Sequence, residues 1–285
     1  MTWLVSLLLA LFGVLGSAGP GGSGVTIAIE PPSADEQGPL PPVTPARGEN
    51  PPLVVIDPGH GGRDPGAPSP FGEVREKDIT LALARAIRDD LARSGRVRVA
   101  LTRDGDTYLP LEARYGLARR LGADLFISIH ADAAPLNDQA RGATVYTLSE
   151  VASDRQAALL AANQNASDLV GGARLSPDPN VNLILIDLAQ RESMNVSADF
   201  ARLLYREAAP VFPFRPDWHR FAAFVVLKAP DIPSILFESG YLTNAVDAAY
   251  VQSPEGRQQI ADGMRRAIEA HFARRLIAAR GRGRA

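Results

Sequence analysis

The chain has 285 residues, of which 46% are hydrophobic and 22% charged, and its formal net charge is −2. A chain of this length and apolar content can bury one substantial core, so we expect one main domain. The small negative charge argues against nucleic acid as the main partner, and the absence of cysteine excludes disulfides and thiolate chemistry.

The first residues of the chain are uncharged and mostly apolar from position 3 to 14, and Gly16, Ser17 and Ala18 follow as small residues suited to cleavage. Because this apolar run is too short to span a bilayer comfortably, we expect residues 1–18 to be a removed signal peptide. The mature protein is then periplasmic or secreted. No Lys or Arg precedes the run, so an uncleaved anchor is the alternative, and this segment is the one expected contact with a membrane.

Residues 19–52 are rich in Gly, Ser and Pro and contain three Pro-Pro pairs. Such a segment has few apolar side chains to bury, so the composition predicts an extended linker. Within it, residues 25–29 have the composition of a single short strand.

From residue 53 to 275 the hydrophobic pattern alternates between strands and helices. Strand patterns fall at 53–57, 97–102, 125–130, 143–147, 223–227 and 234–238, and helical patterns fall around 78–94, 111–121, 197–208 and 255–275. Alternation of this kind predicts a single α/β domain. The basic tail 276–285 is expected to be solvated and frayed, with a contact to anionic wall polymer as the alternative.

Residues able to bind a metal follow three of the predicted strands. His60 lies in a turn of Gly and Pro just after the first strand, His130 ends the third, and Glu238 ends the last. Ligands of open α/β sheets usually bind at these carboxyl ends. Glu76 stands immediately before the first predicted helix, and its neighbour Glu73 is expected to be a free surface carboxylate.

Two imidazoles and a carboxylate are a usual protein ligand set for catalytic zinc, with water in the fourth position. The metal lowers the pKa of that water towards about 7 and polarises a carbonyl, and a further carboxylate can move protons. The spacing does not decide which glutamate binds the metal and which moves protons. A purely structural role of these residues is the alternative.

Five ordered blocks between about residues 53 and 272 resemble the zinc-dependent N-acetylmuramoyl-L-alanine amidases of the bacterial cell wall, of the type that acts at cell division. The blocks are IDPGHGGRDPGA (56–67), EKDITLALA (76–84), LTRDGDTYLPLEAR (101–114), ADLFISIHADA (123–133) and VVLKAPDIPSILFESGYLTN (225–244). The resemblance implies that His60, Glu76 and His130 bind one Zn²⁺ and that Glu238 is the catalytic residue that transfers protons. It also implies a mixed, roughly six-stranded sheet flanked by helices.

Almost fifty residues separate the predicted strand near 148 from the predicted helix near 197, which is long for a structureless connection. Residues 155–169 favour a helix that ends at Gly171-Gly172. Residues 181–188 form a second apolar segment that continues as helix. Both segments resemble the insertion of the division amidases, about 149–196 here, which implies a regulatory helix that covers the zinc until an activator protein displaces it.

One residue of the insertion departs from the family pattern. Relatives often have Glu-Asn where this chain has Gln164-Asn165, and a neutral amide binds Zn²⁺ more weakly than a carboxylate does. Glu150 or Asp168 are candidates to replace it, and the sequence does not choose between them. A helix that only packs over the groove is the alternative.

Three further residues each allow two interpretations. Arg103 and Arg114 flank a turn, where they either pair with Asp104 or Asp106 near the surface or bind a substrate carboxylate bidentately. His219 either contacts the substrate or oxyanion or is structural. The last histidine, at position 271, is expected on the surface.

These observations together predict a peptidoglycan hydrolase that cuts the amide bond between N-acetylmuramic acid and L-alanine. One alternative is another zinc amidohydrolase or peptidase that acts on a different amide. The other is a non-catalytic wall-binding regulator on a degenerate enzyme fold, and the simultaneous presence of all four site residues counts against it.

Overall fold

The computed structural model describes residues 39–170 and 183–282. The expected signal peptide, the strand expected at 25–29 and the Gly171-Gly172 helix end lie outside these ranges. Within them, none of the helices combines the length and hydropathy that crossing a membrane requires.

A mixed sheet of seven strands forms the centre of the fold, in the order β1-β3-β2-β4-β7-β5-β6. The strands are β1 (Val43–Thr44), β2 (Leu53–Pro58), β3 (Arg98–Leu101), β4 (Leu125–Asp132), β5 (Ala143–Leu148), β6 (Phe214–Ala222) and β7 (Ser234–Tyr241). β3, β2, β4 and β7 run parallel, β5 is antiparallel to β7, and β6 is parallel to β5. The predicted α/β domain with a mixed sheet is confirmed, with seven strands in place of roughly six.

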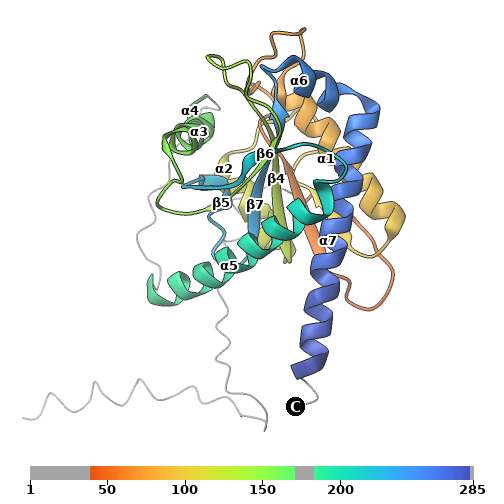
Figure 1. Cartoon of the computed structure of the whole chain (residues 1–285). Helices are drawn as coiled ribbons and strands as arrows, with labels where there is room; N and C mark the ends of the chain where they lie inside the picture. The colour runs from red at the N-terminus through yellow and green to blue at the C-terminus, as the bar shows by residue number, and fades with distance from the viewer. Residues whose placement is uncertain (1–38, 171–182, 283–285) are drawn as a thin grey trace, which may run out of the picture. The chain divides into compact units, whose positions relative to one another are not determined.

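Helices cover both faces of the sheet (Figure 1). They are α1 (Glu76–Ser94), α2 (Leu111–Leu121), α3 (Arg155–Asn165), α4 (Ser167–Val170), α5 (Leu183–Ala208), α6 (Ala245–Gln252) and α7 (Pro254–Arg282), with the 3₁₀ helix η2 at Val225–Leu227. One core cluster joins the sheet to α1, α5 and α7, and a second joins its other face to α2, α3 and η2. The central strands are therefore apolar on both faces, as buried parallel strands usually are.

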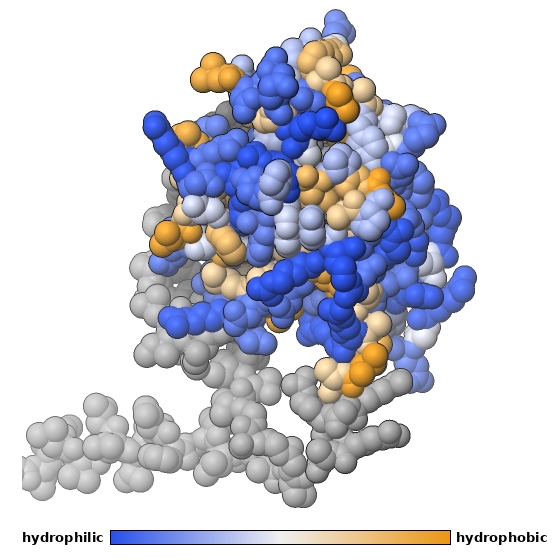
Figure 2. Space-filling view, viewed as in Figure 1, coloured by the Kyte–Doolittle hydropathy of each residue, from blue (hydrophilic) through white to orange (hydrophobic). Residues whose placement is uncertain are grey.

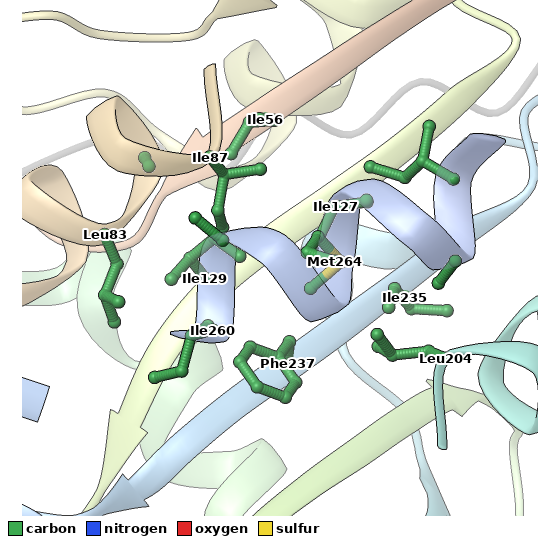
Figure 3. Packing of buried hydrophobic residues seen from close by; sticks show 14 of the residues in the cluster. Ile56, Leu83, Ile87, Ile127, Ile129, Leu204, Ile235, Phe237, Ile260 and Met264 are labelled. Carbon is green, nitrogen blue, oxygen red and sulfur yellow. The ribbon is translucent and has the colours of Figure 1, made fainter. Parts of the chain in front are cut away.

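The first core cluster is built from residues that alternate along the strands (Figure 3). Ile127 and Ile129 of β4 and Phe237 of β7 are fully buried and face Ile260 and Met264 of α7. Since side chains alternate across a strand, His130 and Glu238 must lie on the opposite face, beside α2 and α3. The alternation thus places the candidate site residues on one face of the sheet.

Two strand assignments differ from the prediction. The apolar residues 223–227 form no strand: they contain η2, whose Val226 and Leu227 are buried. The strand at this edge of the sheet is β6 instead. Its residues are mixed polar and apolar, so the hydrophobic pattern does not predict a strand there, because an edge strand needs no continuous apolar face. The sheet also begins before residue 53, since β1, which lies in the expected linker, pairs with β3.

Two helices are longer than predicted. α5 begins at Leu183 and joins the apolar segment 181–188 to the helix expected from 197. α7 continues to Arg282, so the described part of the expected frayed tail is helical. Residues 273–278 of α7 are exposed to solvent. Figure 2 shows that hydrophilic residues dominate the visible face, with apolar residues in small separate groups, as is usual at a protein surface.

Candidate metal centre

The loop after β2 brings His60 close to His130. His60 has a backbone φ of 61°, a left-handed conformation that is uncommon for a residue with a side chain. Its neighbour must be glycine, because a Cβ on Gly59 would lie 2.2 Å from Cε1 of His130. The glycine-rich sequence therefore allows the close approach of the two imidazoles, whose ring centroids are 4.9 Å apart.

Two buried arginines hold this loop in place. Arg114 donates hydrogen bonds to Asp57 Oδ1 at 3.0 Å and to the carbonyls of Pro58 and His60 at 2.9 Å. Arg103 donates to the carbonyl oxygens of Pro58 and Gly59. The expected surface pairing with Asp104 or Asp106 is wrong, because both arginines are buried and their guanidinium groups bond to Asp57 and to backbone carbonyls instead. A loop without regular structure leaves carbonyls unpaired, and the guanidinium groups satisfy them.

The structure brings together His60, Glu76 and His130, the three residues that the resemblance implies as metal ligands. Glu76 Oε1 lies 3.0 Å from His60 Nε2 and 3.0 Å from His130 Nδ1, and the ligand atoms of the three residues all lie within 4.8 Å of one another. None of the three is more than 7% exposed. Glu73, the expected surface carboxylate, is exposed.

The cluster suits a divalent metal ion such as zinc. Its donors are two imidazole nitrogens and a carboxylate. His60 Nε2 lies 3.0 Å from Glu76 Oε1 but makes no well-aligned hydrogen bond within the described residues, which suits an atom that binds a metal ion. Burial lowers the pKa of His60, but the Glu76 and Asp64 carboxylates outweigh this effect and raise it to about 9. The negative charge that favours a proton there would equally favour a bound cation, which competes with that proton.

Asp64 is a site residue that the sequence analysis missed. Its Oδ2 lies 2.8 Å from His60 Nδ1, and its Oδ1 accepts a hydrogen bond from the amide of Gly66. A carboxylate on the far nitrogen of a ligand histidine fixes the ring and its tautomer. The available signal was its place four residues after His60 in the same Gly-Pro turn.

Glu238 lies beside the cluster on β7. It pairs in register with His130 of β4 on one side and with Thr144 of β5 on the other. The side chain is fully buried, and neither carboxylate oxygen has a hydrogen-bond partner in the described part of the chain. Burial, followed by the charges of Asp132 and Glu76, raises the pKa of Glu238 well above its usual range. A buried carboxylate of this kind is suited to accepting and returning a proton.

Helix α3 borders the cluster across a pocket of about 390 Å³. His60 and Glu76 line this pocket together with Asn163 and Gln164 of α3. Neither Glu150 nor Asp168 lines it. Asp168 Oδ1 instead accepts hydrogen bonds from Tyr108 Oη and Leu111 N, both at 2.9 Å.

The two remaining histidines lie away from the cluster. His219 of β6 pairs with Val145, and its Nε2 lies 3.1 Å from Thr147 Oγ1. It does not line the pocket beside His60, which favours the structural interpretation. His271 is buried against Phe200 rather than on the surface, because α7 packs along α5 there.

A buried pair of histidines with a glutamate, at the carboxyl ends of parallel strands and beside a second buried glutamate, is the arrangement of a metal-dependent hydrolase. The chain belongs to the N-acetylmuramoyl-L-alanine amidase family Amidase_3, whose model matches residues 54–270. All four candidate residues fall within the matched range.

Individual relatives agree with this family. The N-acetylmuramoyl-L-alanine amidase AmiC of Escherichia coli is 36% identical over 226 residues, which cover 79% of this chain and 54% of AmiC. AmiA of Escherichia coli is 37% identical over 222 residues, covering 77% of this chain and 76% of AmiA. The chain thus spans about half the length of AmiC and about three quarters of AmiA.

A solved structure agrees with the fold. The catalytic domain of CwlV, an N-acetylmuramoyl-L-alanine amidase from Bacillus (Paenibacillus) polymyxa var. colistinus, superimposes with a TM-score of 0.59 at 25% identity. The match covers 78% of this chain and 98% of the CwlV domain.

Proposed function

We propose that the protein is a zinc-dependent peptidoglycan hydrolase of the periplasm or cell exterior that cuts the amide bond between N-acetylmuramic acid and L-alanine and serves cell division. The observation that carries this proposal is the buried cluster of His60, Glu76 and His130 with Glu238 beside it. Membership of the amidase family supports the bond that is cut.

Each residue of the site has a defined part in this reaction. His60, Glu76 and His130 hold the metal ion, and Asp64 keeps a proton on His60 Nδ1 so that Nε2 stays free as a ligand. When bound, zinc supplies a Lewis acid and lowers the pKa of water. Glu238 accepts the proton of the attacking water on a carboxylate oxygen and returns it to the nitrogen of the leaving L-alanine.

Mass spectrometry of the products released from purified sacculi tests this function. The expected products are stem peptides with a free L-alanine amino terminus and glycan strands with intact N-acetylmuramic acid. Glu238→Gln keeps the shape of the side chain, so we expect it to retain zinc and to slow product release by roughly 10²–10⁴-fold. Cleavage of another bond would favour a different amidohydrolase, and zinc binding without any product would favour a non-catalytic regulator.

We propose further that α3 restricts access to the site until an activator protein displaces it. The position of α3 supports this proposal, because its residues Asn163 and Gln164 line the same pocket as His60 and Glu76. None of the α3 residues that line the pocket is a carboxylate, so on this proposal α3 blocks the site by its position and adds no carboxylate to the metal ligands.

Three contacts at the two ends of the covering segment hold it to the domain. At its start, Asp154 caps α3 by accepting from two of its amides and also binds Arg220 of β6. At its end, Asn165 Nδ2 donates to Ala223 O, and Val225 N donates to Asn165 Oδ1, both at 2.9 Å. Asp168 of α4 forms the third contact, at the start of α2. We call these three the anchoring contacts, and displacement of α3 must break them.

A further inference from the structure

A second unpaired polar group lies next to Glu238. Thr144 of β5 is fully buried, and its Oγ1 has no hydrogen-bond partner within the described ranges. Thr144 and Glu238 are directly opposite each other in the antiparallel pair of β5 and β7. Opposite residues of such a pair share one face of the sheet, with Cβ atoms about 4.5–5.5 Å apart. The hydroxyl and the carboxylate are therefore neighbours.

Two unpaired polar groups side by side in a core need an explanation. Each buried polar atom without a partner costs about 1–3 kcal/mol, and few remain in native proteins. Valine has the same shape as threonine and suits a buried strand without this cost. A buried threonine hydroxyl normally has a hydrogen-bond partner, as Thr147 of the same strand does: its Oγ1 lies 3.1 Å from a ring nitrogen of His219.

The other hydroxyl groups around Glu238 are engaged elsewhere. Ser239 Oγ donates to the carbonyl of His130 at 3.0 Å, and Tyr146 Oη accepts from Arg220 at 3.0 Å. Tyr241 Oη accepts from Arg215 and donates its own proton to the Asp132 carboxylate. Thr144 differs from these residues because it is directly opposite Glu238 and its hydroxyl has no partner at all within the described chain. Rotation about the Cα–Cβ bond of Thr144 gives its hydroxyl three staggered positions.

We propose that Thr144 is a positioning residue, whose Oγ1 donates a hydrogen bond to the Glu238 carboxylate and holds it towards the attacking water. This inference rests on the proposed function, in which Glu238 transfers the proton. A base must be held within about 0.5 Å of its productive position to act efficiently. The strand fixes the backbone of Glu238, and Thr144 fixes the end of its long side chain.

The test compares Thr144→Val, which removes the hydroxyl at constant shape, with Thr144→Ser, which retains it. We expect Thr144→Val to lower kcat about tenfold without changing KM or zinc content, and Thr144→Ser to restore most of kcat. Thr147→Val is the matched control, because it removes a hydroxyl of the same strand that does not lie beside Glu238. Wild-type kcat in Thr144→Val, or equal loss in Thr144→Ser, would overturn the inference.

Combination with Glu238→Gln separates this inference from the proposed function. If Thr144 acts through Glu238, adding Thr144→Val to Glu238→Gln causes no further loss in single-turnover rate. A further tenfold loss in the double variant contradicts a role through Glu238. Wild-type activity of Glu238→Gln alone refutes the proposed function itself. If Thr144→Val does not fold, Thr144→Ala takes its place, with the same expected loss of kcat.

Discussion

Replacement of Asn165 by alanine is expected to activate the enzyme without any activator. The Asn165 side chain makes two hydrogen bonds of 2.9 Å to the backbone around η2. A protein hydrogen bond has a net worth of about 0.5–1.5 kcal/mol, and water can reach the freed backbone groups, so we take about 1–2 kcal/mol for both. While the closed state dominates, the open fraction multiplies the apparent activity. The variant should therefore be about 5- to 30-fold more active than wild type.

The assay is the initial rate of peptide release from dye-labelled sacculi by the full chain, with zinc content and melting temperature measured in parallel. Arg155→Ala is the matched control: it lies exposed on the same helix and, in the structure described, makes no side-chain hydrogen bond or ion pair. We expect it to match wild type. A folded, zinc-loaded Asn165→Ala protein with wild-type activity would show that α3 does not limit access.

The remaining predictions concern the metal and pH. His60→Ala or His130→Ala should abolish tight zinc binding in elemental analysis, because two remaining ligands make no stable site; Glu73→Gln should retain about one zinc. Glu238→Gln should keep its zinc at every pH at which wild type does. Burial lowers the pKa of His271 to about 4, below that of the unfolded chain. Stability should therefore fall by on the order of 1–3 kcal/mol as pH drops from about 6.5 towards 4, and urea unfolding of His271→Leu should show a smaller decline.

Three of the four candidate site residues could be predicted from local features of the sequence, whereas the assignment of Glu76 as a ligand came from the family resemblance. His130 and Glu238 each end a run of apolar residues, and such a run indicates a buried strand whatever the rest of the fold does. In parallel strands the ends meet at one edge of the sheet, so residues more than a hundred positions apart come together. His60 follows from the same argument, with glycines that allow the turn.

The missed features depend on contacts that no local pattern contains. The surroundings of Arg114 are set by Asp57 and by carbonyls of the His60 loop, more than fifty positions away. A charged residue next to an acidic turn is normally solvated, so its burial could not be read from its neighbours. The β6 strand was missed for a similar reason, since its partner β5 lies far away in sequence and its own residues alternate poorly.

The two sides of the proposed active site are held by different means, which bears on its regulation. On the sheet side, strand pairing and buried guanidinium groups fix the ligands of the metal. On the other side, α3 is held by the anchoring contacts at its ends and faces the pocket with Asn163 and Gln164. No residue belongs to both the ligand set and the anchoring contacts. Displacement of α3 therefore leaves all three ligands in place, and on this proposal an activator competes only with hydrogen bonds and packing, not with the much stronger bond between a carboxylate and zinc.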